Sequence, residues 1–144
     1  MKRILAAVDN SPRSRHVLDY AVDLARRTGA KVALFRSVGL PPEIHSQFVT
    51  LGNASLLDQL LDKAREDLVA ASKDVPAEVL DGCFVRIGTP WDAICTEAKE
   101  LDVDLVVIGS HGYSGLDHIL GTTAAKVVNH VDRPVLVVRQ KSPK

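Results

Sequence analysis

The amino-acid sequence predicts an α/β protein: a single domain, residues 1–144, built on an open parallel sheet with helices on both faces. The length of 144 residues suffices for one domain with its own hydrophobic core. Short, nearly continuous aliphatic runs recur along the chain, which is typical of parallel strands that are covered on both faces. Segments with apolar residues at helical spacing separate these runs, so strands and helices are expected to alternate.

Five segments have the composition of strands. Four of them are short and aliphatic, and the remaining one, residues 78–87, is longer and mixed in character. Within it, Asp81-Gly82 indicates a bulge or an irregular start, because glycine interrupts a regular strand. The four short strands are predicted at residues 4–8, 32–35, 105–108 and 135–138.

Four helices are predicted between the strands, at residues 12–28, 57–68, 90–101 and 124–131. The first and third begin with a hydroxyl residue followed by proline, Ser11-Pro12 and Thr89-Pro90, which suits an N-cap and the first helical position. Thr122 or Thr123 is the expected cap of the fourth helix. Residues 39–54 are expected to form the connection into the second helix.

Composition and charge argue against several classes of partner. The 18 basic and 18 acidic residues cancel, so no field of one sign attracts nucleic acid or an anionic membrane. No apolar stretch approaches the roughly 20 residues of a membrane span, and the first apolar run is too short for a signal peptide. Cys83 and Cys95 lack metal-ligand spacing and are expected to be buried, reduced thiols. These observations predict a cytoplasmic protein.

Ligands of open α/β sheets bind at the carboxyl ends of the strands, where the strand order reverses. Asp9 follows the first strand and Gly109 ends the fourth. If these two strands are neighbours, Asp9 and Gly109 face each other across that point.

The stretch IGSHGYSGLDHILGTT, residues 108–123, follows the fourth strand. Gly109 and Gly112 let the backbone turn sharply and approach a ligand closely, since neither carries a Cβ. Gly121-Thr122-Thr123 begins a helix, whose free N–H groups suit a phosphate. Such loops also occur as plain turns, so both interpretations stay open on spacing alone. The stretch is neither a Walker A loop nor a GxGxxG dinucleotide motif.

Three segments carry a resemblance to the universal stress protein family over essentially the full chain: ILAAVD at the start, GTP at residues 88–90, and VVIGSHGYSGLDHILGTTAAKVVNHVDRPVLVVR near the end. ATP-binding members of that family have glycine, two residues, glycine, nine residues, then glycine with serine or threonine. Gly109, Gly112 and Gly121-Thr122 match this pattern, with a spacer of eight residues in place of nine. The resemblance implies a Rossmann-like, adenine nucleotide alpha hydrolase-like fold with strand order 3-2-1-4-5.

The resemblance also implies a site for an adenine nucleotide, ATP or AMP, with Mg²⁺ as a companion of the phosphates. Asp9 would lie beside the adenosine, the backbone of Ser37 beside the adenine, and Gly109 near the ribose. Phosphates would be held by Gly112 and the residues from Gly121 onward. The candidate site residues are Ala7, Val8, Asp9, Ser37, Ile108, Gly109, His111, Gly112, Gly121, Thr122 and Thr123. Arg36 stands where many relatives have histidine.

Dimerisation is the second property that the resemblance implies. It would use the last strand, residues 134–139, which begins at Pro134 and ends at Arg139. An apolar edge strand invites pairing with its own copy, and a larger oligomer stays open.

The glycine-rich stretch supplies backbone donors and hydroxyl groups but no lysine and no evident base, so little or no hydrolysis is expected. The predicted function is therefore a nucleotide-responsive dimeric regulator of the stress response. The alternatives are a slow ATPase, a nucleotide-independent dimeric adaptor, and a hydrolase or transferase that uses the same cleft.

Several residues have a plainer interpretation beside the functional one. Asp9 could cap a helix through its proximity to Ser11. His111 and His118 have no visible third ligand, so a solvated or phosphate-contacting role is favoured over a metal site. Trp91 is expected to belong to the core. No catalytic residue and no metal ligand is assigned.

Overall fold

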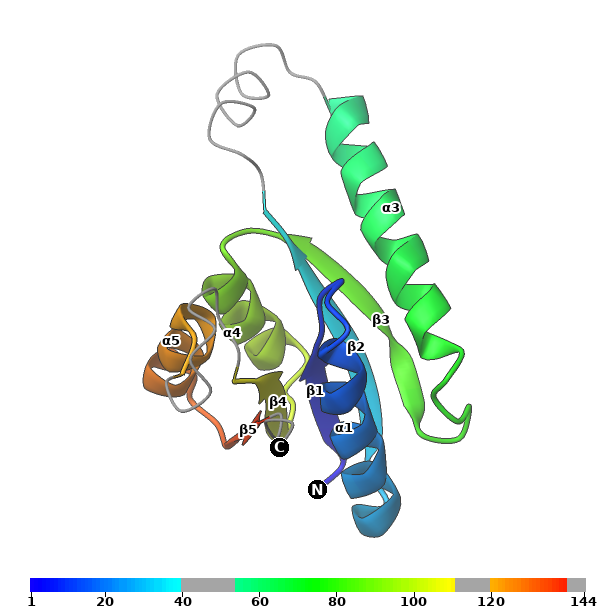
Figure 1. Ribbon diagram of the computed structural model, residues 1–144, viewed down its shortest axis with the longest axis vertical. Helices are drawn as coiled ribbons and strands as arrows, with labels where there is room; N and C mark the ends of the chain where they lie inside the picture. Colours follow the sequence, from blue (N-terminus) through cyan, green and yellow to red (C-terminus); the bar gives the residue numbers. More distant parts are fainter. Residues whose placement is uncertain (40–53, 111–119, 140–144) are drawn as a thin grey trace, which may run out of the picture.

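Five parallel strands form one sheet in the part of the chain that the computed structural model describes, residues 1–39, 54–110 and 120–139 (Figure 1). The strand order is β3-β2-β1-β4-β5, as the resemblance implied. The strands are β1 (Arg3–Ala7), β2 (Lys31–Val38), β3 (Leu80–Ile87), β4 (Leu105–Gly109) and β5 (Val135–Val138). The helices are α1 (Ser14–Thr28), α3 (Ala54–Ser72), α4 (Pro90–Glu100) and α5 (Thr122–His130). The predicted alternation of strands and helices is confirmed.

Helices cover both faces of the sheet, α1 and α3 on one face and α4 and α5 on the other (Figure 1). Successive residues of β1 point to opposite faces, so Ile4 packs under α1 and Leu5 under α4 and α5, both without exposed surface. This double burial explains why the strand sequences are continuously apolar rather than alternating. Burial of each large aliphatic side chain stabilises the fold by about 1.5–3 kcal/mol.

The irregularity expected at Asp81-Gly82 is confirmed. Val32 pairs with Leu80 but Leu34 pairs with Cys83, so β3 contains one more residue than β2 between the two pairs. Gly82 has φ of +115°, a conformation that L side chains rarely adopt. The bulge therefore requires this glycine.

The predicted start of the first helix is wrong by two residues. The helix begins at Ser14, and Ser11 and Pro12 form a turn in which the Ser14 N–H donates to the Ser11 carbonyl at 3.1 Å. The physical reason is Asp9, whose carboxylate accepts hydrogen bonds from both Ser11 and Ser14 and so holds the turn outside the helix.

The predicted cap of the last helix is also wrong. Gly121 is the N-cap residue, and Thr122 and Thr123 are the first two helical residues. Gly121 occupies the cap because its N–H donates to the Ser110 carbonyl at 2.9 Å, while its own carbonyl accepts from the Ala125 N–H at 2.9 Å.

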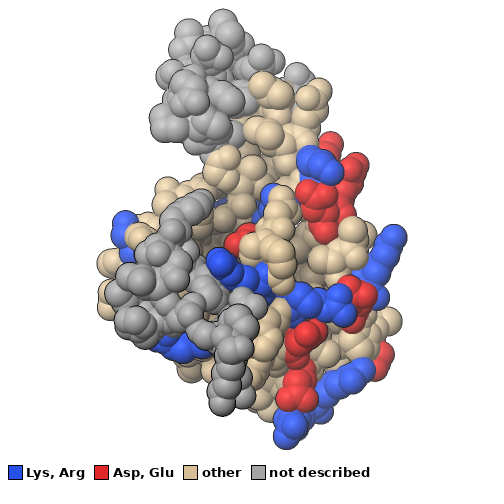
Figure 2. All heavy atoms as spheres, in the orientation of Figure 1, with Lys and Arg blue, Asp and Glu red and all other residues tan. Residues whose placement is uncertain are grey.

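The described surface carries charges of both signs, and both cysteines are free thiols. Figure 2 shows acidic and basic side chains interspersed on the face that it presents. Among the described residues, no helix has both the length and the apolar character that a membrane span requires. Cys83 and Cys95 are free thiols, but both are partly exposed rather than fully buried.

Candidate functional site

A cavity of about 580 Å³ lies at the carboxyl ends of β1, β2, β4 and β5, between the starts of α1, α4 and α5. Its size is within the range of sites for small molecules and cofactors. Eight predicted site residues line it: Ala7, Val8, Asp9, Ser37, Ile108, Gly109, Thr122 and Thr123. Gly121 lies directly before α5 but is not part of the lining. His111 and Gly112 lie outside the described residues.

Asp9 is held in one orientation by its neighbours. Its Oδ1 accepts hydrogen bonds from the Ser11 N–H and from the Ser14 hydroxyl, each at 2.8 Å. Partial removal from water alone would raise the pKa of this carboxyl, but the hydrogen bonds from Ser11 and Ser14 and the charge of Arg36 lower it below its ordinary value. The hydrogen bonds from the Ser11 N–H and the Ser14 hydroxyl both end on Oδ1 rather than on Oδ2. The helix-cap alternative is thus replaced by a turn that presents a carboxylate to the cavity.

Arg36 joins the end of β2 to two other elements. Its Nη1 donates to Asn10 Oδ1 at 2.7 Å and to Asp67 Oδ2 on α3 at 3.2 Å. Asp67 also accepts from Lys63 Nζ at 3.1 Å, and these cationic donors, Lys63 first, lower the pKa of Asp67. A histidine side chain is shorter and has fewer N–H donors than arginine, so it could not contact both Asn10 and Asp67. The arginine at this position therefore ties the loop after β1 to α3.

Gly109 allows α1 to pack against the end of β4. A Cβ at this position would lie 3.3 Å from Val17 Cγ2, closer than nearly all such contacts in folded proteins. The next residue, Ser110, donates from its N–H to the Val138 carbonyl at 3.0 Å and accepts from the Gly121 N–H. These bonds bring the two ends of the glycine-rich stretch together at the base of the cavity.

Comparison with known proteins decides the family. The model of the universal stress protein family matches residues 1–139. The chain belongs to this family.

Individual relatives agree with that assignment. Universal stress protein A homolog 1 of Coxiella burnetii is 31% identical over 146 residues, and the match covers 97% of each chain. Universal stress protein YxiE of Bacillus subtilis is 32% identical over 151 residues, covering 95% of this chain and 98% of YxiE.

Solved structures show the same fold. The protein MJ0577 superposes with a TM-score of 0.80 at 26% identity, covering 99% of this chain and 98% of its own. A universal stress protein in complex with cAMP has a TM-score of 0.60 at 25% identity and covers 96% of each chain.

In this family member, the cavity lining includes two arginines that were not among the predicted site residues. Arg13, directly before α1, and Arg36 both line the cavity and bring positive charge to it. Arg13 was not predicted because it lies four residues beyond Asp9, outside the residues that directly follow the first strand. Arg36 was expected at the end of a strand and differs from the histidine of many relatives, but it was not assigned to the site.

The interpretation of Trp91 as a core residue can be compared with the described residues. Trp91 packs against the α4–α5 core at its edge, with its ring 4.8 Å from that of His130 between centroids and Lys126 Nζ 5.5 Å from the indole centroid. The described residues contain no group of three side chains suited to a metal ion. His118, like His111, lies outside them.

Proposed function

We propose that this protein binds an adenine nucleotide, AMP or ATP, in the cavity at the carboxyl ends of the strands. The observation that carries the proposal is the single cavity that collects Asp9, Ser37, Gly109 and the start of α5 from four separate parts of the chain. A structural relative at 25% identity carries cAMP, which supports an adenine nucleotide as the ligand class.

Each part of the nucleotide has a chemical counterpart in the lining. Asp9 Oδ2 accepts a hydrogen bond from a ribose hydroxyl or from the adenine amino group. Ser37 offers backbone groups to the adenine, and Ala7, Val8 and Ile108 supply apolar contact. His111 and Gly112, which lie outside the described residues, remain part of the proposed site.

The phosphates would meet the start of α5. Thr122 and Thr123 line the cavity and are the first two residues of α5, whose first turn has N–H groups without partners inside the helix. Gly121, as the N-cap residue, lets the backbone approach closely. Mg²⁺ would accompany the phosphates as their counterion.

Binding with little or no hydrolysis fits the chemistry of the described lining. Asp9 is its carboxylate, and a carboxylate with a lowered pKa is a weak general base. Slow ATPase activity is the second candidate, because Arg13 and Arg36 bring cationic charge of the kind that stabilises phosphoryl transfer. Measurement of phosphate release from ATP separates the two.

We further propose that the protein is a nucleotide-responsive homodimer that pairs through the last strand, Pro134 to Arg139, in the cytoplasm. β5 lies at an edge of the described sheet. Pro134 and Val138 accept from Val106 and Ser110 of β4 at 3.0 Å each. Successive residues of a strand direct their N–H and C=O groups to opposite sides, so the N–H of Val137 points away from β4 and would pair with the proposed second copy.

The test of nucleotide binding is direct. Protein purified from cells and then denatured should release AMP or ATP, identified by mass spectrometry. Emptied protein should bind the same nucleotide in isothermal titration calorimetry. An empty preparation that shows no binding at millimolar AMP or ATP contradicts the proposal.

A further inference from the structure

We propose that Arg13 sets the ligand preference of the cavity, selecting nucleotides with a chain of two or three phosphates over the monophosphate. This inference rests on the proposed nucleotide function and adds which member of the ligand class the site prefers.

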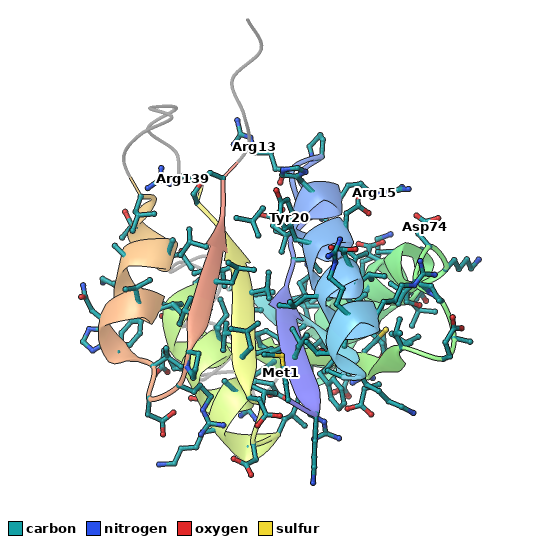
Figure 3. All side chains as sticks on the ribbon, turned by 90° about the horizontal axis from the view of Figure 1, so that it is seen from below. Met1, Arg13, Arg15, Tyr20, Asp74 and Arg139 are labelled. Carbon is teal, nitrogen blue, oxygen red and sulfur yellow. The ribbon has the colours of Figure 1, made fainter. Side chains whose placement is uncertain are left out.

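The position of Arg13 brings its charge to the cavity. Arg13 is the N-cap residue of α1, but its backbone is helical and its side chain makes no capping hydrogen bond. The side chain instead lines the cavity, together with Thr122 and Thr123 from α5. Figure 3 shows Arg13 reaching from the start of α1 toward the ends of β4 and β5. The guanidinium and the start of α5 therefore face one shared space.

The other arginine and the carboxylate of the lining already have partners. Asp9 accepts from Ser11 and Ser14 through Oδ1, and Arg36 is paired with Asp67. The side chain of Arg13 makes no hydrogen bond or ion pair with any described residue. It is the charged group of the lining whose donors remain available to a ligand.

The location of this charge is unfavourable in the empty protein. A cation at the start of a helix opposes the helix dipole, and the first turn of α1 contains no acidic residue. The start of α5 adds a second positive helix end to the same cavity. An anion placed between the two helix starts relieves both effects, so the site favours ligands in proportion to their negative charge.

The arrangement discriminates by the length of the phosphate chain. The start of α5 offers N–H groups and hydroxyls for one phosphate. Arg13 is exposed at the rim and offers a planar fork of donors that matches a second phosphate group. The single phosphate of AMP can bind only the groups at the start of α5. The longer phosphate chains of ADP and ATP can also bind the guanidinium of Arg13.

The experiment is calorimetric titration of wild type, Arg13→Gln and Arg26→Gln with AMP, ADP and ATP at one salt concentration. Arg26 is a matched control, because it is an exposed arginine on the same helix and does not line the cavity. We expect Arg13→Gln to weaken ATP binding about tenfold, the loss of one charge-assisted hydrogen bond, and AMP binding less than about twofold. Arg26→Gln should leave both affinities unchanged, and Arg13→Lys should restore part of the ATP affinity.

The outcomes separate the inference from the function on which it rests. If the wild type binds AMP and ATP but Arg13→Gln weakens both equally or neither, Arg13 does not select the phosphate chain and the inference is overturned. If the wild type binds no adenine nucleotide, the proposed function fails as well. An unchanged melting temperature of Arg13→Gln would show that the exposed substitution left the fold intact.

Discussion

Replacement of Asp9 by asparagine tests the proposed contact with the ribose or adenine while keeping the shape of the side chain. In the wild type, Oδ1 accepts from Ser11 and Ser14 at 2.8 Å each, and Oδ2 is the oxygen proposed to contact the ligand. In Asp9→Asn the amide can keep its oxygen toward Ser11 and Ser14, which places its NH₂ group where a ligand hydroxyl needs an acceptor. Loss of that charge-assisted bond corresponds to about 1.5–3 kcal/mol, or roughly 10- to 100-fold in Kd.

The effect on stability should be much smaller than the effect on binding. Asp9→Asn retains an acceptor for the turn and loses only the charge assistance, and the side chain is exposed, so we expect a loss of about 1 kcal/mol or less at pH 7. Because the folded-state pKa of Asp9 is lowered, its carboxylate stabilises the fold above the unfolded pKa of about 3.8. This contribution disappears as the pH falls through the lowered folded-state pKa, so the two proteins should converge in stability in strong acid.

Calorimetry with AMP measures the affinity, and urea denaturation at neutral and acid pH measures the stability. Asp19→Asn is the control, since Asp19 is an exposed carboxylate on α1 outside the cavity lining. An Asp9→Asn variant that binds AMP as tightly as the wild type would refute the assignment of Asp9 to the ligand. Equal losses of AMP affinity in Asp9→Asn and Asp19→Asn would indicate a general effect of net charge.

Three further predictions concern packing, assembly and thiol chemistry. Gly109→Val should destabilise the fold by about 1–3 kcal/mol in urea denaturation and reduce nucleotide affinity more than tenfold, because its side chain meets Val17 and enters the cavity, whereas Gly109→Ala should be milder. Val137→Pro should shift the molecular mass in light scattering from dimer to monomer, since it removes an outward N–H and no bond to β4; a persistent dimer would exclude this edge. Cys83 and Cys95, whose thiol pKa values are raised mainly by burial, should react with iodoacetamide at pH 7 more slowly in the folded than in the urea-unfolded chain, and equal rates would contradict this.

Local sequence patterns were sufficient for the secondary structure and for part of the site. The aliphatic runs located four of the five strands, because a parallel strand buried on both faces has no polar position to break its pattern. The mixed segment at residues 78–87 located β3. Asp81-Gly82 located the bulge, since a left-handed residue in a strand requires glycine. Asp9 and Gly109 were found because they end strands, and the carboxyl ends of parallel strands are where such folds bind ligands.

Only the tertiary structure determined how distant residues act together. The start of α1 lies at Ser14 rather than Pro12 because Asp9 binds both Ser11 and Ser14, an interaction that no helix-cap pattern contains. The pairing of Arg36 with Asp67 depends on how α3 lies against the sheet, which is set by packing across the whole chain.

The approach of Arg13 to the start of α5 has the same origin. The two segments are more than 100 residues apart in the sequence, and no local pattern relates them. The order β3-β2-β1-β4-β5 places β1 beside β4, and the helices that follow these strands consequently begin at one cavity. The sequence by itself thus determined the strands, the helices and the glycine-rich stretch, whereas long-range packing decided which charges face the proposed ligand.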